Sequence, residues 1–160
     1  MILSDNRISK DEYYLNIAKE VSMRGTCLRR CYGAVIVKDD TIISTGYTGA
    51  PRGFVNCNQI GKCIRQEQGI PPGQRYELCR SVHAEMNAII NASKNDMKDA
   101  TLYVFGRLSG DDKPLEETTC CSMCIRNIVN SGIKTVITYK NGNIDKFEVS
   151  KWVEQDWSFR

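Results

Sequence analysis

The sequence predicts an α/β fold in which helices cover the faces of a β-sheet. Helix-like and strand-like stretches alternate in the order helix, strand, strand, helix, strand, helix, strand, a pattern typical of folds with helices packed on a sheet. The chain has 160 residues, of which 41% are apolar and 26% are charged, as in ordinary globular domains. We therefore expect residues 1–160 to form a single domain.

The first helix and the first two strands have clear local signals. Ser9 and Glu12 form a capping box at the start of a helix over residues 10–24, and apolar residues then recur at four-residue spacing. Two short runs rich in β-branched residues, 32–37 and 41–45, are separated by three polar residues. These runs predict a β-hairpin.

The remaining elements follow from the same kinds of signal. We expect a helix over 82–94 capped by Ser81, a strand over 101–105, an exposed loop over 106–119, a helix from about 121 to Gly132, a strand over 134–139, a turn at 141–142 and a short helix over 150–156. The stretch 54–80 has no clear periodicity, and loops of this length are usually functional or held by another interaction. We treat it as an insertion that contains cysteines.

Charge and hydropathy argue against two kinds of partner. The net charge is +3, which does not favour nucleic acid, and we expect the cluster of Arg24, Arg29 and Arg30 to be a solvated face. No stretch approaches the roughly 18 consecutive apolar residues that span a bilayer. The N-terminus lacks the layout of a secretory signal, so a cytoplasmic location is expected. Eight cysteines in that reducing compartment indicate metal binding.

Two short motifs offer the side chains of a zinc site. His83 is the only histidine of the chain, and Glu85 follows two positions later. Cys121 and Cys124 are three apart at the start of a predicted helix, where both thiols share one face and the helix N-terminus favours thiolates. One imidazole and two thiolates are enough for a catalytic zinc, with a fourth position open for water. Glu85 is then free to accept a proton from that water.

Each motif alone has a simpler explanation. A histidine two residues before a glutamate occurs by chance, and a Cys-x-x-Cys pair can be redox-active. Their combination is more specific, because each motif opens a predicted helix, and this His-x-Glu and Cys-x-x-Cys pattern is the signature of zinc-dependent nucleobase deaminases. The sequence therefore predicts a zinc hydrolase.

The motifs resemble the cytidine deaminase superfamily and, more narrowly, the deoxycytidylate (dCMP) deaminase family. The resemblance covers about residues 11–140 and rests on residues 26–30, 33–37, 46–53, 77–85, 83–89 and 121–124. It implies a three-layer αβα sandwich whose mixed central sheet has four to five strands. It also implies hydrolysis of dCMP to dUMP with release of ammonia, in an enzyme that is commonly a homo-oligomer, activated by dCTP and inhibited by dTTP.

The resemblance assigns roles to individual residues. His83, Cys121 and Cys124 would bind the catalytic zinc, and Glu85 would carry a proton from water to the cytosine ring and then to the leaving amine. The backbone after His83, at Ala84, would contact the base. The glycine-rich loop over residues 46–53, which includes Thr48, would contact the sugar and the phosphate.

Four features depart from the family pattern. Thr48 replaces an asparagine. Cys120 replaces the proline before the Cys-x-x-Cys pair, so that a pairing of Cys120 with Cys124 is an alternative to the preferred Cys121 with Cys124. The loop over 106–119 is longer than usual and is expected to affect substrate choice. The fifth strand and last helix are expected to be reduced to a short tail after Asn143.

The resemblance also implies a second, structural zinc. Some members of the family hold one with Cys and His residues of this region, and Cys27, Cys57, Cys63 and Cys79 could close a tetrahedral site and hold the insertion. Cys31 could replace one of them. The alternative is that these are buried free thiols, which behave as small apolar side chains.

Three arginines are candidates for the substrate phosphate, since a guanidinium binds phosphate in a forked geometry. They are Arg52, Arg80 and Arg107. Two other functions stay open at this point: a deaminase for another cytosine or adenine nucleoside, nucleotide or tRNA, and a non-catalytic binding module that zinc stabilises.

Overall fold

The computed structural model describes residues 4–155, which form a single five-stranded sheet with helices on both faces. The elements are α1 (Lys10–Ser22), β1 (Arg30–Lys38), β2 (Thr41–Tyr47), α2 (Cys57–Ile60), α3 (Ile64–Glu67), the short 3-10 helix η1 (Tyr76–Leu78), α4 (Ala84–Ile90), α5 (Lys94–Met97), β3 (Thr101–Leu108), α6 (Ser122–Ser131), β4 (Thr135–Lys140), β5 (Asn143–Glu148) and α7 (Ser150–Glu154). Among the described residues, no helix is both long and apolar enough to cross a lipid bilayer.

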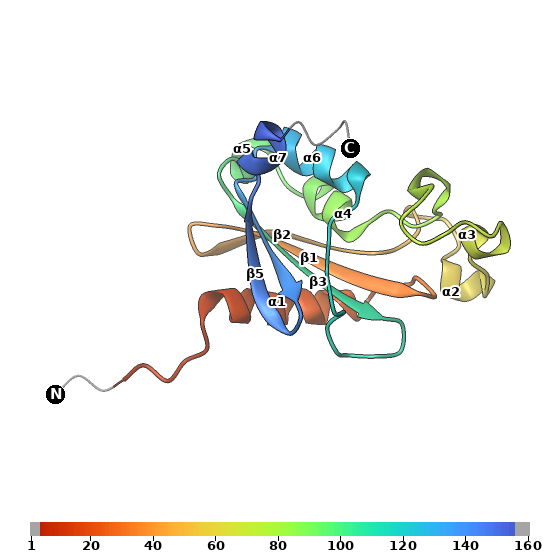
Figure 1. Ribbon diagram of the computed structural model, residues 1–160, viewed down its shortest axis with the longest axis horizontal. Helices are drawn as coiled ribbons and strands as arrows, with labels where there is room; N and C mark the ends of the chain where they lie inside the picture. Colours follow the sequence, from red (N-terminus) through yellow and green to blue (C-terminus); the bar gives the residue numbers. More distant parts are fainter. Residues whose placement is uncertain (1–3, 156–160) are drawn as a thin grey trace.

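The sheet is mixed and runs in the order β2-β1-β3-β4-β5. β3 and β4 are parallel, and the other neighbouring pairs are antiparallel. Figure 1 shows α1 on one face of the sheet and α4, α5, α6 and α7 on the other. This is the three-layer arrangement with a mixed sheet that the sequence predicts.

Alternation along β1 explains why both faces are covered. Val35 and Val37 pack with α1 in one apolar cluster, whereas Ala34 and Ile36 belong to a second cluster with α4 and α6. Successive side chains of a strand point to opposite faces, so an unbroken apolar run such as this one indicates a strand that is buried on both sides. The core of the molecule therefore consists of two layers, one on each side of β1, β3 and β4.

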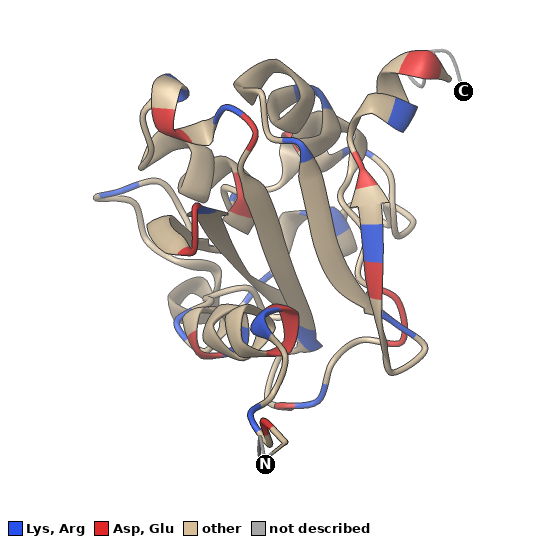
Figure 2. Cartoon of the chain, turned by 90° about the vertical axis from the view of Figure 1, so that its left-hand side faces the viewer, with Lys and Arg blue, Asp and Glu red and all other residues tan. Residues whose placement is uncertain are grey.

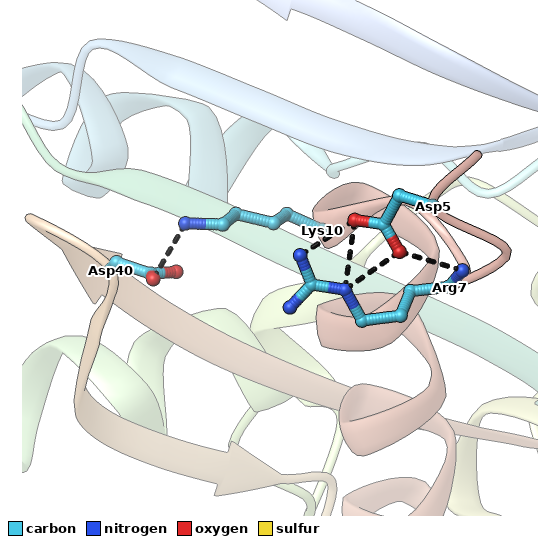
Figure 3. A network of polar contacts seen from close by, with 4 residues as sticks. All are labelled: Asp5, Arg7, Lys10 and Asp40. Carbon is cyan, nitrogen blue, oxygen red and sulfur yellow. Dashed lines mark hydrogen bonds and ion pairs between the residues drawn. The ribbon is translucent and has the colours of Figure 1, made fainter. Parts of the chain in front are cut away.

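The hairpin turn is fastened to the start of α1. Asp39 and Asp40 have φ values of 50° and 59°, the left-handed backbone that a tight hairpin turn requires. Figure 3 shows Lys10 reaching across to Asp40, with 2.6 Å between Nζ and Oδ2, and the nearby pair of Asp5 and Arg7. Charges of both signs are interspersed on the face in Figure 2, which agrees with the small net charge.

The helix predicted over 82–94 is in fact two helices. α4 begins at Ala84 with His83, not Ser81, at its N-cap, and it ends at Ile90. Ser93 then caps α5, because its hydroxyl accepts a hydrogen bond from the backbone N–H of Asp96. A serine that caps the next turn competes with continuation of the helix, and this ends the apparent periodicity early.

The prediction that the fifth strand is reduced to a short tail is wrong. β5 is a full strand that pairs antiparallel with β4 from Asn143 to Glu148. Most of its side chains are exposed, so its sequence lacks the apolar alternation by which strands are recognised. The backbone makes its hydrogen bonds to β4, and these bonds require no particular residue pattern in the sequence. The last helix, α7, is present over Ser150–Glu154; residue 156 of the predicted range lies outside the described residues.

Gly46 sets the distance between β2 and α4. A Cβ atom added there would lie 2.3 Å from the backbone N of Ala88 and 2.4 Å from the carbonyl O of Ala84.

Gly46→Ala is therefore expected to lower the free energy of unfolding by about 1–3 kcal/mol or more, since backbone atoms cannot move aside as side chains do. Guanidinium denaturation measures the change. Gly49→Ala is the matched control, because its added Cβ meets nothing nearer than 3.5 Å; equal losses in both variants would contradict the close packing.

Candidate metal centre

Two helix N-termini form the centre of the site. His83 is the N-cap of α4, Cys121 is the N-cap of α6, and Cys124 lies in the first turn of α6. α4 and α6 lie next to each other on the same face of the sheet (Figure 1). The three residues that the sequence predicts as zinc ligands are thus brought together from two segments that are far apart in the chain.

The ligand atoms are spaced as a tetrahedral zinc requires. Nδ1 of His83 lies 3.3 Å from Sγ of Cys121 and 3.5 Å from Sγ of Cys124. Bonds of about 2.0 Å to nitrogen and 2.3 Å to sulfur at a tetrahedral angle place the two atoms about 3.5 Å apart. Within residues 4–155, this is the one group of three His, Cys, Asp or Glu residues whose ligand atoms all lie within 4.8 Å of one another. The donor set and its spacing both fit zinc.

Hydrogen bonds within the cluster shift the pKa values of its thiols and of its imidazole. The hydrogen bond from the Cys124 thiol holds the pKa of Cys121 at about 4, and the same contact raises the pKa of Cys124. Burial opposes the charged form of His83, but its hydrogen bonds with Cys121 and Cys79 outweigh burial and raise the pKa of His83 to about 10. Binding of a metal ion to this cluster would release a proton from His83 and a proton from Cys124.

Glu85 lies in the same cavity as His83 and Cys121 but is not part of the ligand cluster. Its side chain is only 3% exposed. Burial raises the pKa of its carboxyl, against the opposing charge of His83. A buried carboxyl with a raised pKa beside a metal site is the environment of a residue that accepts and then donates a proton.

Cys120 does not join the ligand cluster. Its thiol hydrogen-bonds to the carboxyl of Glu85, and burial together with that carboxylate raises the pKa of Cys120 well above its usual value. The structure therefore places Cys121 and Cys124 in the ligand cluster, and it places Cys120 beside the carboxyl of Glu85. The alternative pairing of Cys120 with Cys124 is not the arrangement found.

The four cysteines predicted for a second zinc lie in or near the metal cavity, but their sulfur atoms do not form one cluster. Cys27, Cys63 and Cys79 line the cavity of the catalytic cluster, while Cys57 is buried with its Sγ 3.8 Å from Oγ of Ser81. Burial, and then the neighbouring thiols of Cys27, Cys79 and Cys63, raise the pKa of Cys57. In the described part of the chain these four thiols are not within 4.8 Å of one another.

Cys31 lies apart from the ligand cluster. It is fully buried in β1, and its Sγ lies 3.4 Å from the carbonyl oxygen of Cys27. Burial raises the pKa of its thiol. Cys31 therefore has the surroundings of a buried apolar side chain.

Two of the arginines predicted to bind phosphate lie elsewhere. Arg52 borders a separate cavity formed by the glycine-rich loop and donates a hydrogen bond to Oδ1 of Asn91 at 3.2 Å. Arg80 donates to the carbonyl oxygen of Val55 at 2.6 Å. Neither side chain is among the described residues that line the metal cavity.

Arg107 is a buried structural residue. Its guanidinium donates to the hydroxyl and the carbonyl oxygen of Ser22, at 3.2 and 3.1 Å, and to the carbonyl oxygen of Asp111 at 3.0 Å. These bonds tie the loop after β3 to the end of α1. Residue type alone made these three arginines candidates. Their hydrogen bonds hold them elsewhere, and none of the three lines the metal cavity.

The remaining predicted contacts lie near the cluster. Thr48 is buried and lines the metal cavity, and its hydroxyl accepts from the backbone N–H of Tyr32 at 3.1 Å. Ala84 is fully buried as the first residue of α4. The cavity also contains residues that the sequence did not indicate: Arg29, Arg30, Tyr32, Arg65, Pro72, Tyr76 and Thr119. Arg29 and Arg30, expected on a solvated face, border the cavity; their position at the start of β1 was the available signal.

The fold and the site together define a class of protein. A mixed sheet that presents one histidine and two cysteines at the starts of two adjacent helices, beside a buried glutamate, is the arrangement of zinc-dependent deaminases. The family model described as the cytidine and deoxycytidylate deaminase zinc-binding region matches residues 8–140. The chain belongs to this family.

Relatives of this chain include deaminases of phage and yeast. A deoxycytidylate deaminase of Mycobacterium phage D29 is 37% identical over 132 residues, which cover 79% of this chain and 91% of the relative. The deoxycytidylate deaminase of Schizosaccharomyces pombe is 32% identical over 152 residues, covering 93% of this chain and 43% of the relative. The chain thus spans less than half the length of this yeast protein.

Solved structures show the same fold. The dCMP deaminase of cyanophage S-TIM5, in complex with dCMP and dUMP, matches with a TM-score of 0.58 at 23% identity, covering 82% of this chain and 83% of that one. A cytidine deaminase of Burkholderia pseudomallei matches with a TM-score of 0.56 at 12% identity, covering 90% and 95%. These likenesses confirm the predicted α/β sandwich.

Proposed function

We propose that the chain hydrolyses dCMP to dUMP with release of ammonia. The observation that carries the proposal is the buried carboxyl of Glu85 in one cavity with the His83, Cys121 and Cys124 cluster. The phage D29 relative, of which this chain covers nine-tenths, bears the name deoxycytidylate deaminase, and this supports dCMP as the substrate.

The residues of the cavity divide the work of the reaction. His83, Cys121 and Cys124 would hold zinc, which when bound supplies the Lewis acidity that makes water a nucleophile near neutral pH. Glu85 takes a proton from that water, gives it to N3 of the cytosine ring, and transfers the second proton to the leaving amine. The oxygen of water ends on C4 and the amine leaves as ammonia, so atoms and charge balance. Thr48 and the backbone of Ala84 stay predicted contacts of the nucleotide.

The proposal is tested by a panel of substrates. Ammonia release is measured with dCMP, cytidine, dCTP and an anticodon-loop RNA, each with and without dCTP or dTTP as effector. The highest kcat/KM is expected for dCMP. Activity confined to RNA would exclude a mononucleotide deaminase. Absence of activity on every substrate, in protein that holds zinc, would favour the non-catalytic zinc-stabilised module.

Regulation by dCTP and dTTP and assembly into a homo-oligomer are part of the same proposal. The separate cavity at the glycine-rich loop is lined by Arg24, Arg52 and the ring of Tyr47, which suits a nucleotide with several phosphates. Exposed apolar side chains in the insertion, at Phe54 and Val55, support an interface with a second copy.

We also propose a structural zinc bound by Cys27, Cys57, Cys63 and Cys79. What supports it is that three of the four thiols, those of Cys27, Cys63 and Cys79, line one cavity, and that the same three raise the pKa of the Cys57 thiol. Four thiolates are a usual ligand set for structural zinc. Such an ion would join Cys27, which precedes β1, to the insertion that contains α2, α3 and η1.

A further inference from the structure

The metal cavity carries more positive charge than its chemistry requires. Three arginines line it, Arg29, Arg30 and Arg65, whereas Glu85 is the one carboxylate among its described lining residues. The proton-transfer mechanism uses Glu85 and none of the arginines. Even when the thiolate of Cys121 is counted with Glu85, three guanidinium groups face two anionic groups, which indicates that the ligand of the cavity is itself negatively charged.

Arg65 is the most unusual of the three, because it is buried. The residue is 6% exposed. Its Nε and Nη2 donate to the carbonyl oxygen of Gln74 at 3.2 and 2.8 Å, and Nη2 also reaches the carbonyl oxygen of Pro71 at 3.4 Å. Its guanidinium lies 4.3 Å from the centre of the Tyr76 ring. These contacts fix the plane of the guanidinium.

One edge of that guanidinium stays open. Among residues 4–155, Arg65 has no carboxylate within 4.0 Å. Within the described residues, Nη1 of Arg65 makes no hydrogen bond. The buried polar atoms that lack a partner do not include Nη1. Nη1 is therefore accessible, and Arg65 lines the metal cavity. A buried charge without a counter-ion is unfavourable, so an anion in this cavity would be bound strongly.

The position of Arg65 relative to the metal ligands suits a nucleotide. The ring of Tyr76 lies between them: it packs under Arg65 and meets the imidazole of His83 edge-on, with 5.3 Å between ring centres. A base bound beside His83 and Glu85 would therefore be separated from the guanidinium of Arg65 by the ring of Tyr76. Figure 1 shows α2 and α3 at the end of the sheet next to the segment that leads into α4.

We propose that Arg65, together with Arg29 and Arg30 at the mouth of the cavity, binds the 5′-phosphate of the substrate. The insertion over residues 54–80 would then select a nucleoside monophosphate over the nucleoside. This inference rests on the proposed deaminase function. It replaces Arg52, Arg80 and Arg107 as the phosphate-binding residues.

The test compares two substrates that differ only in the phosphate. For Arg65→Gln, we expect kcat/KM for dCMP to fall about 100-fold, a usual loss when one partner of a buried charge pair is removed, while kcat/KM for deoxycytidine stays within about threefold. Arg29→Gln lies at the mouth and should show the same selective loss on a smaller scale. Arg126→Gln, an exposed arginine of α6, is the matched control and should change neither value.

Product binding gives a readout apart from turnover. Calorimetry should show that Arg65→Gln weakens dUMP binding but leaves deoxyuridine binding unchanged. Arg65→Lys keeps the charge and most of the packing, so it should fold normally and recover part of the preference for dCMP.

Two outcomes would overturn the inference. If Arg65 only balances the thiolates of Cys63 and Cys79, then Arg65→Gln will lower both substrates equally and will reduce the zinc content. If the ratio of dCMP to deoxycytidine activity is unchanged in both Arg65→Gln and Arg29→Gln, the phosphate lies elsewhere. A wild-type protein that deaminates deoxycytidine but shows no preference for dCMP would overturn the phosphate subsite as well. A wild-type protein without activity on either substrate would instead refute the proposed function.

Discussion

Replacement of Glu85 by glutamine is expected to lower kcat for dCMP by about 10²–10⁴-fold, the usual contribution of a positioned proton-transfer group. An amide has nearly the same shape as a carboxyl group but cannot take up and release the proton. The side chain is 3% exposed and burial disfavours its charged form, so a neutral amide introduces no new buried charge. We expect zinc content and thermal unfolding to be unchanged. Ammonia release, metal analysis and calorimetry measure the three quantities.

Glu154→Gln is the matched control for this change, because it makes the same substitution at an exposed position of α7. It should leave kcat unaltered. Full turnover in Glu85→Gln would exclude Glu85 as the proton carrier. A loss of turnover accompanied by a loss of zinc would show that Glu85 acts on the metal site instead of on the proton.

Replacement of Cys121 by alanine is expected to remove about one zinc per chain and to abolish measurable turnover, since two remaining ligands do not hold a catalytic zinc. Cys121 lies within 3.3 Å of the His83 Nδ1 and caps α6. The unfolding temperature should also fall, because an ion that binds the folded chain stabilises it. Metal analysis and ammonia release on the same sample test the prediction.

Cys120→Ala separates the two candidate ligands. This variant removes the adjacent thiol, which contacts Glu85 and not the ligand cluster, so its zinc content should equal that of the wild type. Loss of zinc in Cys120→Ala, with retention in Cys121→Ala, would reverse the assignment. The same measurement tests the structural zinc. One three-residue site and one four-cysteine site correspond to about two zinc ions per chain in the wild type, and a value of about one would exclude the second site.

The metal cluster could be predicted from sequence because its ligands sit at helix starts with short, recognisable spacing. His83 with Glu85 and Cys121 with Cys124 each lie within one turn of a helix, so local geometry already constrains them. Membership of one cluster required the two helices to be neighbours, which the order of the elements implies. The sheet and its two helical layers were predictable for a similar reason, since β1 and β3 are continuous apolar runs.

The proposed phosphate-binding residues could not be predicted from the sequence in the same way. Arg65 lies in α3 of the insertion and Arg107 near the end of β3, and both residues are buried. Arg107 is satisfied by oxygens of the α1 end and the loop after β3, whereas Arg65 keeps one edge open in the cavity. This difference depends on how the insertion folds back, for which its sequence has no periodic signal. The full length of β5 could not be predicted, because backbone hydrogen bonds pair it with β4 and most of its side chains are exposed.

The caps of the helices show how this fold trades stability for chemistry. Ser9 and Ser93 cap α1 and α5 with their own side chains, whereas His83 and Cys121 make no such bond at α4 and α6. A proper side-chain cap is worth about 1 kcal/mol, so a serine or aspartate at either position would favour the helix while removing a metal ligand. α3 and α7 also begin without a side-chain cap, but His83 and Cys121 are the N-cap residues that belong to the ligand cluster. A capping serine at either position would therefore gain the stability of a cap and lose the stability that a bound metal ion contributes.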